Sequence, residues 1–96
     1  MQVDCRWHGM SEGVEVSPDL ADPARSRRAL PPFREVIYRY EGEPYLRMLL
    51  SADFVDSYGV TEEGSIDLPD QYPPWYKEMA VVCERCAEEA IGRSRP

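Results

Sequence analysis

Four residues of this chain have the chemistry of metal ligands, and they form two pairs at opposite ends of the sequence. Cys5 and His8 are the first pair, Cys83 and Cys86 are the second, and each pair has two intervening residues. This spacing lets a tight turn or the first turn of a helix direct two ligand atoms toward one ion. Three thiolates and one imidazole are a standard tetrahedral set for structural zinc. The sequence therefore predicts a zinc site formed by Cys5, His8, Cys83 and Cys86.

The inventory of cysteine and histidine supports this prediction. The three cysteines and the single histidine of the chain all belong to the two pairs. Three cysteines cannot all form disulfides within one chain, and the first residues lack the basic head and apolar run of a secretory signal. We therefore expect a reducing, cytoplasmic setting. Two alternatives stay open: reduced thiols in a small core, and a redox switch in which oxidation of Cys83 and Cys86 releases metal.

The free energy of zinc binding is large enough to hold the two ends together. Residues 9–82 separate the pairs, so closing this loop costs on the order of 4 kcal/mol of chain entropy. Structural zinc contributes about 10–16 kcal/mol near neutral pH. A helix after Cys83 would help further, because its N-terminal amides lower the pKa of nearby thiols.

Composition places the chain among globular proteins and limits its partners. Apolar residues make up 43% of the chain and charged residues 30%, and the net charge is −7. No apolar stretch approaches the ~20 residues that a membrane span needs. Residues 41–70 contain eight acids against Arg47 alone, so the excess negative charge lies in this acidic segment. We expect one domain, residues 1–96, with no membrane contact and no open basic surface for nucleic acid.

The first half of the chain is predicted to be extended, then irregular, then a hairpin. Residues 3–16 read as an extended stretch with Gly9 and Gly13 as turn points, and residues 17–32 carry four prolines typical of a loop. Two runs rich in β-branched and aromatic residues follow. They flank a turn at residues 41–44, so we predict a β-hairpin from residues 34–40 and 45–50.

The second half is predicted to contain two helices and a short strand. Ser51 is placed to cap a helix over residues 52–58, and Gly59 to end it in the left-handed conformation. Residues 60–74 read as a polar connector. Residues 79–82 are predicted to be a strand and residues 84–91 a helix ending at Gly92, with a single helix over residues 74–91 as the alternative. The candidate core consists of Trp7, Trp75, Tyr38, Tyr40, Leu46, Met48, Leu50, Met79, Val82 and Ile91.

The two ends of the chain resemble treble-clef zinc proteins. The sequence of residues 80–91, AVVCERCAEEAI, is similar to their C-terminal half, in which an apolar strand runs into CxxC on the first turn of a helix. Residues 5–9, CRWHG, are similar to their N-terminal knuckle. The resemblance implies a metal centre of Cys5, His8, Cys83 and Cys86. It covers about twenty residues and implies no particular activity, because one fold serves many functions.

These patterns lead to one functional hypothesis and one rival. The only histidine is used as a ligand, and a closed four-ligand site leaves no position for a catalytic water, so we expect no enzyme activity. The hypothesis is a small α+β, zinc-stabilised, treble-clef-like domain with a β-hairpin and a C-terminal helix. It would act as a protein-interaction or regulatory module through the acidic segment, with another protein as partner. The rival is a nucleic-acid-binding zinc finger that uses Arg25, Arg27, Arg28, Arg34 and Arg39.

Overall fold

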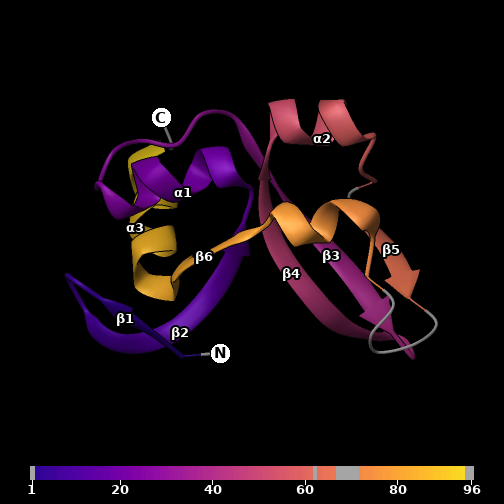
Figure 1. Ribbon diagram of the computed structural model, residues 1–96, viewed down its shortest axis with the longest axis horizontal. Helices are drawn as coiled ribbons and strands as arrows, with labels where there is room; N and C mark the ends of the chain where they lie inside the picture. The colour runs from indigo at the N-terminus through magenta and orange to yellow at the C-terminus, as the bar shows by residue number, and fades with distance from the viewer. Residues whose placement is uncertain (1, 62, 67–71, 95–96) are drawn as a thin grey trace.

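The fold is an α+β arrangement seen in a computed structural model, which describes residues 2–61, 63–66 and 72–94 (Figure 1). The described residues form one mixed sheet, three α-helices and a 3-10 helix. Among these helices none is long and apolar enough to cross a membrane. The elements are β1 (Gln2–Cys5), β2 (Gly9–Val16), α1 (Pro18–Arg25), β3 (Phe33–Tyr40), β4 (Glu43–Ser51), α2 (Ala52–Tyr58), β5 (Glu63–Ile66), η1 (Pro74–Glu78), β6 (Ala80–Cys83) and α3 (Glu84–Ser94).

Strand β2 joins the two ends of the chain. Residues 9–12 of β2 pair antiparallel with β1, and residues 13–16 pair antiparallel with β6. Only Glu15 and Val16 pair with β4, in parallel, opposite Met48 and Leu49. The rest of the sheet is the antiparallel β3–β4 hairpin, with β5 parallel to β3. The N-terminal parts of β2 and β4 therefore diverge, as Figure 1 shows.

The predicted hairpin is present and has a two-residue turn. Glu41 and Gly42 connect β3 to β4, and both have positive φ, 52° and 81°. Positive φ at both central positions matches the twist of the flanking strands, and glycine adopts it without strain. The strands are longer than predicted, and their register shifts between Tyr38 and Arg39.

The predicted helix over residues 52–58 is also present, with both of its predicted ends. The Ser51 hydroxyl accepts a hydrogen bond from the Phe54 amide at 3.0 Å, and Gly59 ends the helix with φ of 61°. The strand-then-helix prediction for the C-terminal region is correct as well, because β6 leads directly into α3. Helix α3 continues through Gly92 to Ser94, so that glycine is not its end.

Three further predictions of local structure are wrong. Residues 17–32 were predicted to be a loop, but they contain α1. Pro18 does not prevent this helix, because it occupies the first turn, where a backbone amide has no partner within the helix. Pro23 removes one internal hydrogen bond at most, and one apolar face of α1 is buried. Gly13 lies inside β2 rather than in a turn, and the connector over residues 60–74 contributes β5 and the first residue of η1.

The buried residues form two clusters, one on each face of β4. Leu49 points into the first cluster, and Leu46, Met48 and Leu50 point into the second, as strand alternation requires. We call these the terminal cluster and the central cluster. The terminal cluster is formed by Val16, Leu20, Ala21, Ala24, Leu30, Leu49, Val82, Ala87 and Ala90, and the central cluster by Val36, Leu46, Met48, Leu50, Phe54, Val60 and Trp75.

Most of the predicted core residues lie in these clusters. Five of them are buried: Leu46, Met48, Leu50, Trp75 and Val82. Three more, Tyr38, Met79 and Ile91, pack at the edges of the clusters, and Tyr40 is half-buried. Trp7 was wrongly placed in the core, because its side chain is 46% exposed. It stands between two ligand residues in a tight turn, so its neighbours occupy the inward directions.

Candidate metal centre

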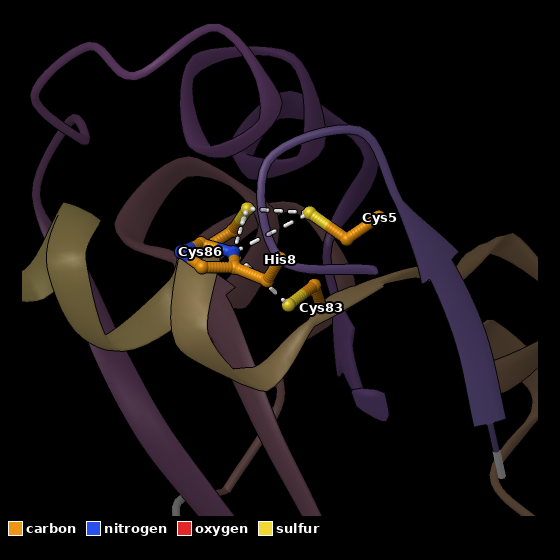
Figure 2. Close-up of side chains that lie close together, drawn as sticks. All are labelled: Cys5, His8, Cys83 and Cys86. Carbon is orange, nitrogen blue, oxygen red and sulfur yellow. Dashed lines mark hydrogen bonds between the residues drawn. The ribbon is translucent and has the colours of Figure 1, made fainter. Parts of the chain in front are cut away.

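The four predicted ligands come from two strand ends that β2 holds together. Cys5 is the last residue of β1, and His8 lies in the turn that leads into β2. Cys83 is the last residue of β6, and Cys86 is in the first turn of α3. Figure 2 shows the three sulfur atoms and the imidazole ring directed toward one another. The structure therefore brings together residues that are 75 to 81 positions apart in the chain.

The distances between the ligand atoms fit a tetrahedral metal ion. The four atoms all lie within 4.8 Å of one another. The sulfur of Cys5 is 3.4 Å from both the His8 Nδ1 and the Cys86 sulfur, and His8 Nδ1 is 3.5 Å from the sulfurs of Cys83 and Cys86. Bonds of about 2.3 Å to sulfur and about 2.0 Å to nitrogen give tetrahedron edges of roughly 3.5–3.8 Å. The donor types are consistent with zinc, and the four printed distances of 3.4–3.5 Å are close to these edge lengths.

The turn between Cys5 and His8 has the backbone that this geometry needs. Gly9 has φ of 72°, a backbone conformation that residues with a Cβ rarely adopt. A Cβ at this position would meet no neighbouring atom, so it is the backbone conformation that favours glycine here. The amide of Trp7 lies 3.4 Å from the Cys5 sulfur, to which it donates. The turn is therefore fixed by the glycine conformation and by an amide that stabilises negative charge on the sulfur.

Hydrogen bonds lower the pKa of two of the thiols. Partial burial raises the pKa of Cys5, but hydrogen bonds from the Trp7 amide and from its partners in the cluster lower it from 9.0 to about 6. Burial also raises the pKa of Cys83, and hydrogen bonds from Ser11 and from two backbone amides at the start of α3 lower it overall. The expected effect of the helix N-terminus on a thiol is thus present at Cys83.

The third thiol, Cys86, lies close to the other two sulfurs, and a cation would relieve the repulsion between their negative charges. Burial raises the pKa of Cys86 to about 12, and the adjacent sulfurs of Cys5 and Cys83 add to the rise. Three thiolates cannot be placed this close together without a compensating positive charge. A divalent cation held by the four residues would supply that charge and would favour the deprotonated form of Cys86.

His8 is oriented by a carboxylate that the sequence analysis did not identify. Its Nδ1 faces the sulfurs, and its Nε2 lies 3.1 Å from Oε1 of Glu89. A ligating histidine commonly donates its second N–H to a carboxylate, which fixes the ring and its tautomer. The signal was available, because Glu89 follows Cys86 by three positions and therefore lies on the same face of α3. The hydrogen bonds with Cys5 and Glu89 raise the pKa of His8.

A set of arginine contacts fastens the Cys5–His8 turn to the end of α1. The indole N–H of Trp7 donates to the Arg25 carbonyl at 3.2 Å, and the guanidinium of Arg25 donates to the Val81 carbonyl at 2.7 Å. Arg27 lies 4.9 Å from the centre of the Trp7 ring and 4.0 Å from Glu89. The turn, the end of α1 and α3 are thereby linked around the ligands.

The other candidate surfaces are distributed over several elements. Arg25, Arg27 and Arg28 lie at the end of α1, whereas Arg34 and Arg39 belong to β3. The described acids of the acidic segment are spread over three places: Glu41 and Glu43 are at the hairpin turn, Asp53 and Asp56 are in α2, and Glu63 is the first residue of β5. The acids at positions 62, 67 and 70 lie outside the described residues.

The local arrangement of the ligands is compatible with a zinc-finger-like site. The first ligand pair precedes β2, and the second pair lies where the apolar strand β6 becomes α3, as the treble-clef resemblance implies. Comparison with protein-family models, with curated proteins and with solved structures finds no match to this chain. The four residues Cys5, His8, Cys83 and Cys86 are placed to hold a metal ion, and their chemistry is consistent with zinc.

Proposed function

We propose that this chain is a non-catalytic zinc-binding protein in which the ion has a structural role and the terminal region is treble-clef-like. One observation carries the proposal: the ligand atoms of Cys5, His8, Cys83 and Cys86 lie within 4.8 Å of one another, although the two pairs lie at opposite ends of the chain. The ion would tie β1 and its turn to β6 and α3. A structural ion of this kind contributes its binding free energy directly to folding.

The ligand set supports a structural rather than a catalytic ion. Catalytic zinc sites keep one position open for water, whereas three cysteines and a histidine fill a tetrahedron. Cys83 and Cys86 are buried, and the side chain of His8 is only 13% exposed. The chain has no second histidine to act as a general base. With the ion in a structural role, we propose a regulatory or interaction function with another protein as partner, supported by the excess negative charge of the chain.

The decisive experiment measures metal content and folding together. We expect about one zinc per chain after purification, and visible d–d bands of tetrahedral thiolate-bound cobalt after metal exchange. Cys86→Ser should lose most of the metal and the cooperative unfolding transition. Glu88→Gln, which changes an exposed residue on the same helix, is the matched control and should retain both. A metal-free protein that still unfolds cooperatively, or a Cys86→Ser variant with one zinc per chain, would contradict the proposal.

One observation favours a second function, the binding of single-stranded nucleic acid. The exposed ring of Trp7 is flanked by the guanidinium groups of Arg6, at 5.1 Å, and Arg27, at 4.9 Å. Aromatic rings and arginines are used together to stack bases and contact phosphates. The net charge of −7 opposes this function. A salt titration with a labelled oligonucleotide separates the two, because phosphate binding weakens steeply with salt; no binding at low salt removes the second function.

A further inference from the structure

A groove opens where β2 and β4 diverge, and α3 forms its third wall. Beyond Glu15 and Val16, β2 has no residue paired with β4. The space between them has a volume of about 400 Å³, which is within the range of ligand-binding pockets. Figure 1 shows β2 and β4 separating away from this short stretch of pairing. Its lining residues come from β2, β3, β4 and α3.

Acidic side chains surround this groove. Five glutamates line it, from β2, β3 and α3, and Arg47 is the single basic residue of the lining. Arg47 donates to Glu35 at 3.0 Å, so its charge is already compensated. All five glutamates lie outside the acidic segment 41–70, so the total charge of that segment does not reveal them. The acids of the lining are Glu12, Glu15, Glu35, Glu84 and Glu88.

Two of these glutamates stand together on α3 without a counter-ion. Glu84 and Glu88 are four positions apart, so they occupy the same face of the helix, and both are exposed. Within the part of the chain that the structure describes, neither forms a hydrogen bond or an ion pair. A like-charged pair at this spacing weakens a helix, and a cation bound in the groove would remove that repulsion.

The groove also has apolar walls. Val14 of β2 and Ile91 of α3 are half-buried at the edge of the terminal cluster, and the buried Ala87 of α3 also lines the groove. Tyr45 of β4 is 43% exposed at the other wall. The lining of the groove therefore combines apolar contact surface with negative charge.

We propose that this groove binds a short segment of a partner protein in which lysines or arginines flank apolar side chains. The complementarity of charge and apolar surface selects this occupant: the basic groups meet Glu84, Glu88 and Glu12, and an apolar side chain contacts Val14 and Ile91. The proposal rests on the proposed function, because the zinc ion would hold α3 and β2, two walls of the groove, in place. It assigns the interaction surface to the groove rather than to the acidic segment.

The test uses the zinc-loaded protein and a fluorescein-labelled peptide in which lysine and leucine alternate. Fluorescence anisotropy should show saturable binding of this peptide and none of a glutamate–leucine counterpart. The double variant Glu84→Gln/Glu88→Gln should weaken binding about tenfold, since it removes two exposed charges from the groove lining. Asp53→Asn/Asp56→Asn removes the same charge from exposed positions of α2, outside the groove lining, and should leave the affinity unchanged.

Several results would overturn the groove proposal. They are equal weakening by both double variants, no weakening by Glu84→Gln/Glu88→Gln, and binding of the acidic peptide with the same affinity. Concentration-dependent self-association of the parent that the α3 variant abolishes would show that the occupant is a second copy of the chain. Zinc content is measured for every sample. Peptide binding by a metal-free protein would overturn the proposed function alone, and binding insensitive to the α3 variant in a zinc-loaded protein would overturn the groove alone.

Discussion

The molecule consists of two halves that are built in different ways. The terminal half, made of β1, β2, α1, β6 and α3, is assembled from both ends of the chain. The central half, made of β3, β4, α2, β5 and η1, comes from a single continuous stretch. Each half has its own buried cluster, and Figure 1 shows the two halves side by side with β4 at their junction.

The difference lies in how much chain entropy each half must overcome. In the central half a two-residue turn connects β3 to β4, so that pairing closes a very short loop. In the terminal half β2 must find β6, and residues 17–79 lie between them. The candidate metal ligands occur only in the terminal half. The proposed ion would thus strengthen the half that the chain itself connects poorly.

Removal of the ion should therefore affect the two halves unequally, and this is the largest effect we expect. After chelation, or in Cys86→Ser, the terminal half should lose amide protection because about 10–16 kcal/mol of metal binding is lost. The β3–β4 hairpin should keep more of its protection. Hydrogen exchange with and without chelator measures this. Equal loss of protection in both halves would mean that they form one cooperative unit.

Acidification should have the same unequal effect, because protons compete with the metal for its ligands. Metal binding requires three thiolates and a neutral imidazole, so the apparent zinc affinity falls as the pH is lowered. The raised pKa of His8 increases this competition, since the ring takes up its proton at a higher pH than a free histidine does. The lowered pKa of Cys5 acts in the opposite direction, because this thiol loses its proton more readily than a free cysteine does and competes for a proton only as the pH falls toward about 6.

The measurement is the zinc content after dialysis at a series of pH values, with hydrogen exchange on the same samples. Zinc loss and loss of protection in the terminal half should occur together as the pH falls toward about 5. Protection of the β3–β4 hairpin should persist to lower pH. Full zinc retention in this range, or loss of the hairpin first, would contradict the comparison of the two halves.

A cavity in the central cluster should lower stability and leave metal binding intact. Leu50 is completely buried in that cluster, so Leu50→Ala should lower the free energy of unfolding by about 2–5 kcal/mol. Zinc content of the folded variant should stay at the parental level, because Leu50 contributes to the cluster opposite the one beside the ligands. Chemical denaturation and elemental analysis measure the two quantities. Loss of zinc from folded Leu50→Ala would show that the central half positions the ligands.

The sequence predicted the local features of both halves better than their long-range organisation. The Ser51 cap, the Gly59 end and the β3–β4 hairpin depend on neighbouring residues, and all three are correct. The four ligands were also identifiable, because their spacing reflects local turns and their types are otherwise absent from the chain. Local chemistry is what a single sequence displays.

The features that the sequence did not predict depend on tertiary contacts. Helix α1 has too many prolines to be recognised as a helix, and burial of Leu20, Ala21 and Ala24 against the sheet stabilises it. The parallel pairing of β5 with β3 gives no local signal, since parallel strands are not joined by a tight turn. Trp7 was assigned to the core by its hydrophobicity, but its turn directs it outward.

Glu89 allows a finer test of the terminal half. Glu89→Gln should lower zinc affinity about 10–100-fold, because the amide is a weaker acceptor for the Nε2 proton of His8 than the carboxylate is. Competition with a chromophoric chelator measures the affinity. Glu88→Gln is the matched control, since this neighbour has no contact with His8 among the described residues. Equal affinities of the two variants would show that Glu89 does not orient the histidine.

The smallest effect we predict concerns Ser51, which joins the two halves. The buried Ser51 hydroxyl donates to Asp19 at 2.5 Å and accepts from the Phe54 amide, and the Ser51 amide donates to the Ser17 hydroxyl at 2.9 Å. Ser17 and Asp19 belong to the start of α1, so these bonds connect the capped end of α2 to the terminal half. Ser51→Ala removes the cap and should lower the free energy of unfolding by about 0.5–2 kcal/mol.

The same variant tests whether this junction couples the halves. If it does, Ser51→Ala should separate the loss of amide protection in the two halves further when zinc is removed, because the bond from the Ser51 hydroxyl to Asp19 is lost and the bonds that remain across the junction, such as the one from the Ser51 amide to Ser17, connect the halves less strongly. Ser57→Ala, at an exposed position of the same helix, removes a hydroxyl without touching the junction and should change neither quantity. A Ser51→Ala protein as stable as the parent would mean that water replaces the lost bonds, and the coupling would then have to come from Leu49 and Leu50 on the two faces of β4.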